Sequence, residues 1–308
     1  MTHEPIPHWP GELVRMGDQQ VYVRSTPDKT GEPALCVHGL AGSSRNWTDL
    51  IDLLRPRLAC DALDLPGFGD SPPRPDRRYS IAALAQTVAA LIESREQRVH
   101  LIASSLGGTV AVKVAAARPD LVRTLTLISP ALPDPRPHLD QVHFAVLSLP
   151  GVGPRLLRKY DVLPPRNRVA DVITTCFSDP ARFPAERFAT EVAELARRDT
   201  LDHATAALIG TIRTLTADFF RKGRHTGWRD AARITAPTLV IYGSDDRVVD
   251  PRLAGRAAHA FANSRIVVLP RTGHLAHMEH PEQVAAEITI MLDATAQRAR
   301  EFPLAPAG

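Results

Sequence analysis

The sequence predicts an α/β fold in which a mostly parallel sheet is covered by helices on both faces. Six short runs rich in Val, Leu and Ile are typical of strands buried on both faces. Stretches with helical periodicity separate most of these runs, and such alternation of strand and helix is the pattern of a parallel sheet. The alternation stops between about 131 and 228, which indicates an insertion into this architecture.

The expected elements follow in chain order. Residues 13–26 alternate around a polar turn, which predicts an antiparallel hairpin at one edge of the sheet. Helices are expected after the candidate N-cap Ser80, from near Leu106 to Pro119, and from Pro251. The buried strands are expected at 34–39, 58–67, 99–104, 121–129, 237–243 and 264–270.

The segment 131–228 contains helical patterns with no strand-like run among them, at 144–160, 168–177 and 185–199. We therefore expect a helical cap at 131–228 over the strand ends of a core domain formed by 1–130 and 229–308. The apolar residues of the cap predict a largely apolar pocket. They are Phe144, Leu147, Leu149, Leu156, Leu157, Val172, Ile173, Phe177, Leu208, Phe219 and Phe220.

The composition is that of an ordinary globular protein, with 44% hydrophobic and 23% charged residues. The 37 basic and 34 acidic residues are mixed along the chain, so we expect no nucleic acid partner. No apolar run approaches the ~18 residues of a membrane span, and the first residues do not resemble a secretory signal. We expect a cytoplasmic protein with no membrane span, and the sequence leaves its oligomeric state open.

The stretch VHLIASSLGG places serines where a strand meets a helix. Residues 103–107 match the G-x-S-x-G pattern of a nucleophile elbow, with Ala103 in place of the first glycine. This match makes Ser105 the candidate nucleophile, because backbone N–H groups at a helix N-terminus favour a developing negative charge. The alternative is a serine that merely caps a helix.

Four other stretches extend the elbow into a wider pattern: VHGLAGSSRNW (37–47), DLPGFGDS (64–71), YGSDDRVVDP (242–251) and RTGHLAHMEHPEQV (271–284). With them the chain resembles the α/β-hydrolase fold family, in particular its cap-bearing serine hydrolases. The resemblance covers nearly the whole chain and implies an eight-stranded, mostly parallel sheet. It identifies the four stretches as two structural loops, the acid loop and the histidine loop.

The resemblance also implies a catalytic triad in the order Ser105, Asp246, His274. A serine hydroxyl needs a base to take its proton, and the base needs a carboxylate to orient it. His274 would be the base and Asp246 the acid. Asp245 competes with its neighbour, and only the family's G-x-x-D spacing from Gly243 favours Asp246.

A tetrahedral intermediate needs N–H donors for its oxyanion, and the resemblance assigns them to the backbones of Leu40 and Leu106. His274, His277 and His280 are spaced three residues apart, and such a spacing of histidines is also compatible with a metal site. In the resembling family only the first of these histidines is catalytic, so we expect no metal and no cofactor.

These residues predict a serine hydrolase that cleaves a carboxylic ester of a small, largely apolar substrate through an acyl-enzyme. Three alternatives stay open: a carbon–carbon bond hydrolase of a dienoic ketone acid, a cofactor-free perhydrolase, and a hydrolase-fold ligand receptor. The three cysteines Cys36, Cys60 and Cys176 are expected to be buried thiols in a reducing compartment.

Overall fold

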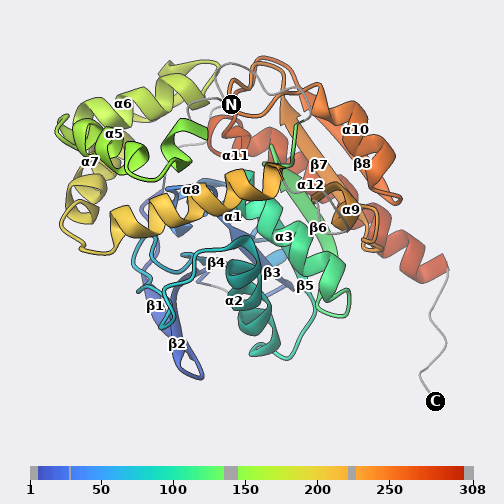
Figure 1. The fold of residues 1–308 in the computed structure, drawn as a ribbon. Helices are drawn as coiled ribbons and strands as arrows, with labels where there is room; N and C mark the ends of the chain where they lie inside the picture. The colour runs from blue at the N-terminus through green and yellow to red at the C-terminus, as the bar shows by residue number, and fades with distance from the viewer. Residues whose placement is uncertain (1–5, 28, 135–144, 221–226, 302–308) are drawn as a thin grey trace.

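A sheet of eight strands lies at the centre of the molecule in the computed structural model, which describes residues 6–27, 29–134, 145–220 and 227–301 (Figure 1). Its spatial order is β1-β2-β4-β3-β5-β6-β7-β8. The bounds are β1 Gly11–Met16, β2 Gln19–Ser25, β3 Glu32–Val37, β4 Leu58–Leu63, β5 Val99–Ser104, β6 Val122–Ile128, β7 Thr238–Gly243 and β8 Ser264–Leu269.

The pairing directions confirm the predicted mostly parallel sheet. β1 and β2 form the expected edge hairpin, and β2 is antiparallel to β4. The remaining neighbours, from β4 to β8, are all parallel. Parallel strands carry their carboxyl ends to one edge of the sheet, so the loops that follow them meet there.

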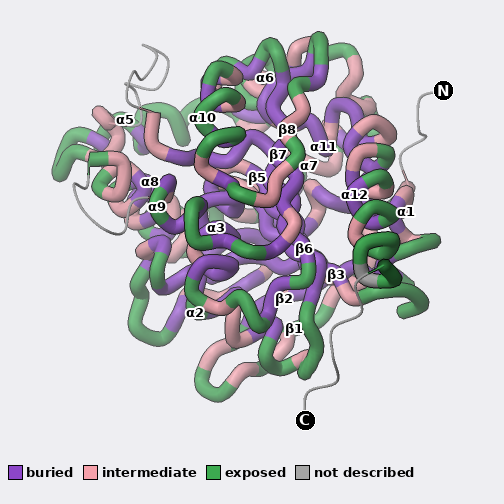
Figure 2. The backbone as a smooth tube through the Cα atoms, turned by 90° about the vertical axis from the view of Figure 1, so that its right-hand side faces the viewer, coloured by how far each residue is buried: buried purple, intermediate pink, exposed green. Residues whose placement is uncertain are grey.

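Helices cover both faces of the sheet and divide the core in two (Figure 1). One cluster packs β-strand side chains against α2 (Ile81–Glu93), α3 (Ser105–Ala117), α9 (Gly227–Ala231) and α10 (Leu253–Ala260). The other packs them against α1 (Thr48–Leu54) and α12 (Pro281–Glu301). Successive β3 residues belong to opposite clusters, as the two-residue period of a strand requires: Leu35 to the first and Cys36 to the second. Figure 2 shows the central strands as buried, whereas the edge strands β1 and β8 are mostly intermediate or exposed.

The helix starts follow local sequence signals. The Ser80 side chain accepts a hydrogen bond from the Ala83 N–H at 3.1 Å, so the predicted N-cap of α2 is confirmed. The helix α3 begins at Ser105, directly after the last residue of β5, with no intervening turn residue. Short helices complete the loops: η1 (Ser44–Trp47) before α1, and α11 (Ala276–Glu279) before α12.

Between β6 and β7 the described residues form helices and no strand. They include α5 (Val152–Asp161), α6 (Pro165–Cys176), η2 (Pro180–Arg182), α7 (Ala185–Arg198), α8 (Ala204–Phe220) and α9. The sequence patterns anticipate α5, α6 and α7 but do not single out α8. Phe144, counted among the cap's apolar residues, lies outside the described residues. None of the described helices has the length and apolar composition needed to cross a membrane.

Candidate active site

Ser105 lies at a sharp junction between strand and helix. Its φ of +50° is in the left-handed region, which is strained for a residue other than glycine. The chain can turn this tightly because the neighbouring positions are small. A Cβ atom at Gly107 would overlap the carbonyl oxygens of Val37 and His38 on β3 and its loop. Ala103, which departs from the elbow pattern, is fully buried, so its methyl group is accommodated in the core.

His274 and Asp246 are joined by a hydrogen bond between His274 Nδ1 and Asp246 Oδ2 at 2.9 Å. Both side chains are almost fully buried. The other carboxylate oxygen, Oδ1, accepts hydrogen bonds from the backbone N–H groups of Val248 and Val249, each at 2.8 Å. Because the carboxylate accepts from Nδ1, the imidazole is held in one orientation and Nε2 is left for proton transfer.

Asp245 is directed away from this pair. Its side chain is exposed and accepts hydrogen bonds from Ser178 Oγ at 2.5 Å and Ser244 Oγ at 2.7 Å. These two hydrogen bonds, with that of Ser178 first, lower the pKa of the Asp245 carboxyl. Of the two adjacent aspartates, Asp246 therefore contacts the imidazole and Asp245 links the acid loop to the helical insertion.

Ser105, His274 and Leu40 line a common cavity of about 650 Å³. The cavity is bounded by the loops after β3, β4, β7 and β8, by the junction of β5 and α3, and by residues of α5 to α8. The β3 loop lies against the serine, since a Cβ atom at Gly39 would be 3.1 Å from Ser105 Cβ and 3.7 Å from its Oγ. Leu106 is fully buried in the first turn of α3, where backbone N–H groups have no partner within the helix.

The buried His38 fixes the loop that carries Leu40. Its Nε2 accepts a hydrogen bond from the Leu65 N–H at 2.9 Å, so Nδ1 is the nitrogen that donates to the Gly39 carbonyl at 2.7 Å. Burial lowers the pKa of His38 to about 4, which keeps the ring neutral and suited to this pair of contacts. The side chain thereby ties the β3 loop to the β4 loop.

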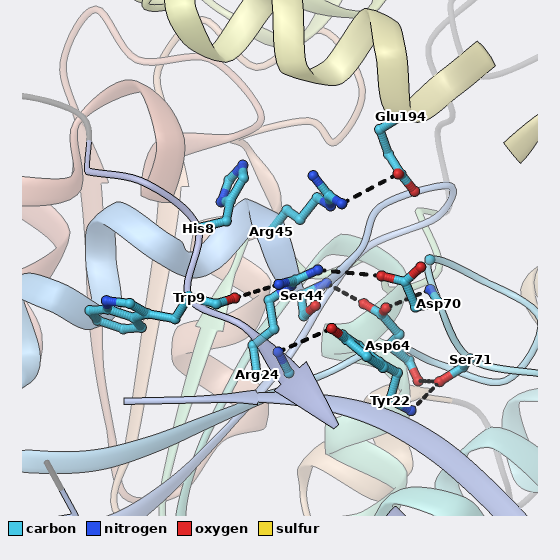
Figure 3. A network of polar contacts seen from close by, with 12 residues as sticks. His8, Trp9, Tyr22, Arg24, Ser44, Arg45, Asp64, Asp70, Ser71 and Glu194 are labelled. Atoms are coloured by element: carbon cyan, nitrogen blue, oxygen red, sulfur yellow. Dashed lines mark hydrogen bonds and ion pairs between the residues drawn. The ribbon is translucent and has the colours of Figure 1, made fainter. Parts of the chain in front are cut away.

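The β4 loop is a structural element (Figure 3). The Asp64 carboxylate accepts hydrogen bonds from the N–H groups of Ser44 at 2.5 Å and Asp70 at 2.7 Å. Ser71 Oγ donates to the Asp64 carbonyl at 2.6 Å and accepts from the Tyr22 N–H at 2.7 Å. Burial raises the pKa of Asp64. These side chains hold loops together beneath the cavity.

Ion pairs connect the same loops to the helical insertion. Arg45 of η1 pairs with Glu194 of α7 at 3.4 Å, and Figure 3 shows this contact above the Asp64 network. Arg197 pairs with Asp70 at 2.8 Å. On α1, Asp49 pairs with Arg187 at 2.5 Å. The helix α7 is therefore attached to the sheet domain by charges along its length.

The histidine loop is attached to the helical insertion as well. Glu279 Oε2 accepts a hydrogen bond from the Gly273 N–H at 2.7 Å, and Oε1 accepts from the Asp179 N–H at 2.8 Å. The Cys176 carbonyl accepts from the Leu275 N–H at 3.2 Å. The residues on either side of His274 are thus held by α11 and by the segment that follows α6.

The three regularly spaced histidines have different surroundings. His274 binds Asp246, whereas His277 stacks on Trp47 with ring centroids 4.4 Å apart. Burial, with a smaller effect of His274, lowers the pKa of His277 to about 3. His280 Nε2 lies 3.2 Å from the Arg271 carbonyl oxygen. Within the described ranges no three His, Cys, Asp or Glu side chains form a group that could hold a metal ion.

The cysteines are free thiols. Cys36 and Cys60 are buried in the core, and burial raises the pKa of Cys36. Cys176 lines the cavity, and burial raises its pKa to about 12. A thiol that stays protonated is a poor nucleophile, so Cys176 forms part of the cavity wall and does not act as a nucleophile.

Six charged residues that line the cavity were not identified from the sequence: Asp161, Arg168, Asp171, Glu191, Arg198 and Asp199. Two of them, Glu191 and Arg198, lie on α7. Burial raises the pKa of Glu191 and lowers that of Arg198. With Leu195, which also lines the cavity, they occupy one helix face at i, i+4 and i+7. This i, i+4, i+7 spacing is the sequence signal that could have placed Glu191 and Arg198 on the same helix face as Leu195. By contrast, the basic residues Arg155, Arg158 and Lys159 of α5 are exposed.

A model of the alpha/beta hydrolase fold matches residues 33–281. The chain is 30% identical to a putative carbamate hydrolase RutD of Pseudomonas savastanoi (79% of this chain, 86% of that protein). It is 26% identical to a pimeloyl-[acyl-carrier protein] methyl ester esterase of Neisseria meningitidis (85% and 93%). It is 25% identical to a 2-hydroxy-6-oxononadienedioate/2-hydroxy-6-oxononatrienedioate hydrolase of Cupriavidus pinatubonensis (87% and 89%).

A longer relative and a solved structure complete the comparison. The chain spans 64% of the dihydrolipoyllysine-residue acetyltransferase component of an acetoin cleaving system from Pseudomonas putida, to which it is 28% identical over 85% of its own length. The crystal structure of a membrane phospholipase A superposes with a TM-score of 0.78 at 22% identity, covering 94% of this chain and 87% of the other. At that identity the superposition establishes the fold alone.

Proposed function

Since the chain belongs to the α/β-hydrolase fold family, and the relatives named above include a putative carbamate hydrolase and a methyl ester esterase, we propose that it is a serine hydrolase that cleaves a carboxylic ester. The observation that carries the proposal is the buried hydrogen bond between His274 and Asp246 at a cavity that Ser105 also lines. The strained backbone of Ser105 supports it, because strain of this kind is common at catalytic residues.

In the proposed reaction Ser105 Oγ attacks the ester carbonyl carbon while His274 Nε2 takes the hydroxyl proton. The tetrahedral intermediate collapses, the carbon–oxygen bond to the alcohol breaks, and the imidazolium returns its proton to the leaving oxygen. Water then attacks the acyl-enzyme with His274 again as base, which releases the carboxylic acid and restores the serine. Asp246 orients the imidazole and stabilises its charged form.

The proposed oxyanion hole uses the backbone N–H groups of Leu40 and Leu106. Leu106 stands one residue after the nucleophile at the N-terminus of α3, and Leu40 follows Gly39, which packs against Ser105. Both assignments need backbone atoms only, so their side chains are free to pack. One such donor contributes roughly 10²–10³-fold in rate.

The cavity favours a small, largely apolar substrate. Its volume of about 650 Å³ falls within the usual range of small-molecule sites. Five of the apolar cap residues noted in the sequence line it: Leu157, Val172, Ile173, Phe177 and Leu208. We propose that the helices between β6 and β7 act as a cap that selects this substrate, and that Glu191 and Arg198 contact any polar group it carries.

A panel of p-nitrophenyl esters of graded acyl length tests the proposal. We expect hydrolysis by the wild-type protein and a loss of about 10⁴-fold in kcat/KM in Ser105→Ala and in His274→Ala. The neighbouring Ser104→Ala is the matched control and should stay within a few-fold of wild type. Unchanged turnover in Ser105→Ala or His274→Ala would refute the assignment.

Carbon–carbon bond hydrolysis is the second candidate, favoured by the similarity to the dienedioate hydrolase of Cupriavidus pinatubonensis. A dienoic ketone acid belongs in the same panel for that reason. Cleavage of this acid with negligible turnover of every ester would replace the ester proposal. Both reactions would be lost in Ser105→Ala if the same serine serves them.

A further inference from the structure

We propose that the outer face of α5 and the turn after it bind an anionic lipid surface. The α5 face is defined as Val152, Leu156, Tyr160, Val162 and Leu163. This inference concerns where the protein acts and does not depend on the reaction proposed above.

The α5 face is apolar and exposed. Val152, Leu156 and Tyr160 are spaced four residues apart and are 42%, 41% and 37% exposed. They form a stripe that adjoins the buried side of the helix, where Leu157 lies about 100° around the axis from Leu156. The stripe continues into the turn, where Val162 is 84% and Leu163 40% exposed. An outer helix face of a soluble domain normally carries polar side chains instead.

Exposed apolar side chains are concentrated at this place. Seven of the eleven exposed large hydrophobic residues in the described part of the chain lie between 149 and 172. Single exposed hydrophobics need no explanation, but a cluster marks a surface that another phase or molecule covers. In Figure 1 α5 and α6 lie at the periphery of the molecule, away from the strands.

The charges around the α5 face identify the occupant. The helix carries Arg155, Arg158 and Lys159 but one acidic residue, Asp161, so its ten residues have an excess of two positive charges. Asp161 is itself paired with Arg168 at 3.1 Å. All three basic side chains are exposed. Apolar and basic residues on adjoining stripes are the pattern of helices that lie in the interface of an anionic membrane.

The size of the face favours a lipid surface over a protein partner. A helix of ten residues is about 15 Å long. It is too small to provide the roughly 800 Å² that each side of a standard protein interface buries. Long basic side chains can also extend to lipid headgroups while the apolar side chains enter the acyl region.

The α5 face is continuous with the cavity. Tyr160 belongs to the stripe and also lines the cavity, as does Val172 of α6, which is 51% exposed. An apolar ester dissolved in a membrane would therefore meet apolar side chains both on the α5 face and in the cavity that Ser105 lines, although charged residues such as Asp161 and Asp171 also line that cavity. A lipid-bound α5 would place the cavity entrance where such substrates are concentrated.

Co-sedimentation with large unilamellar vesicles tests the proposal, using phosphatidylcholine alone and an equal mixture of phosphatidylcholine and phosphatidylglycerol. We expect binding to the mixed vesicles, at least tenfold weaker binding to phosphatidylcholine, and a loss of affinity as salt screens the charges. Leu156→Asp and Arg158→Glu should each weaken binding about tenfold or more. Neither side chain lines the cavity, so hydrolysis of a water-soluble p-nitrophenyl ester should be unchanged.

Ile290→Asp is the matched control, since Ile290 is a helical residue of α12 with 45% exposure, and it should bind like the wild type. Absence of binding to mixed vesicles, or an equal loss in Ile290→Asp, would overturn the proposal. Loss in Arg158→Glu with full binding in Leu156→Asp would also overturn it, because the vesicles would then be bound by charge alone and not by the apolar α5 face. Ser105→Ala should bind vesicles like the wild type, so failure of the hydrolase proposal would be seen separately.

Discussion

At the scale of single residues, the site depends on which atoms the fold brings together. Two adjacent aspartates have the same chemistry, yet the acid loop turns one toward His274 and the other toward Ser178. Asp246 reaches the imidazole because backbone N–H groups of the next two valines hold its second oxygen. The sequence spacing favours Asp246, but the partner of Asp245 lies 67 residues away and has no local sequence signal.

The two aspartates provide a paired prediction. Asp246→Asn should lower kcat by roughly 10³–10⁴-fold, because an amide no longer favours the imidazole tautomer and charge that catalysis needs. Asp245→Asn removes an exposed carboxylate and should change kcat by less than about threefold. Steady-state ester hydrolysis measures both. The reverse ranking would move the acid to Asp245.

At the scale of elements, small residues set how closely the helices approach the sheet. Gly107 lets α3 lie against the backbone of β3, and this contact positions the Ser105 junction. Sequence motifs identify the need for small residues at the elbow. They do not identify the contacts between α7 and the sheet domain, because Arg187 and Asp49 are 138 residues apart.

Substitution of two helical glycines by alanine distinguishes the effect of close packing on stability from the effect of helix propensity. Gly107→Ala should destabilise the protein by about 1–3 kcal/mol, because the added methyl group overlaps the carbonyl oxygens of β3. Gly255→Ala, in α10, has no atom within 4 Å of the new Cβ and should stabilise by up to about 1 kcal/mol. Urea unfolding monitored by circular dichroism gives both values. Equal effects at the two positions would show that the close contact is unimportant.

At the scale of the whole molecule, buried histidines make stability depend on pH. His277 is buried, and its pKa falls from 6.5 to about 3 on folding. Between these values the unfolded chain binds a proton that the folded chain does not, so stability is present above pH 6.5 and decreases as the pH falls toward 3. His38, with a pKa of about 4, acts in the same direction.

His277→Gln removes one of these groups. The free energy of unfolding should then fall less steeply between pH 6.5 and 4, by up to about 1.4 kcal/mol per pH unit relative to wild type. Urea titrations across this pH range measure the difference. A variant and a wild-type protein with parallel pH profiles would contradict the assigned pKa of His277.

The sheet, its edge hairpin and most helices were predictable because buried strands and amphipathic helices leave periodic patterns in the chain. The helix α8 was missed, since its pattern is apolar around much of its surface: Leu208, Ile209 and Ile212 do not form a single narrow stripe. Glu191 and Arg198 were missed because a charged residue on a helix is usually solvated. Their place in the cavity depends on how α7 docks.

The central claim, that Ser105 is an activated nucleophile, is tested most directly by a fluorophosphonate followed by mass spectrometry of the digested protein. We predict one adduct, on the peptide that contains Ser105, formed rapidly by the wild type and lost in both Ser105→Ala and His274→Ala. An unlabelled wild-type protein, or an adduct that persists when residue 105 is alanine, would contradict the account.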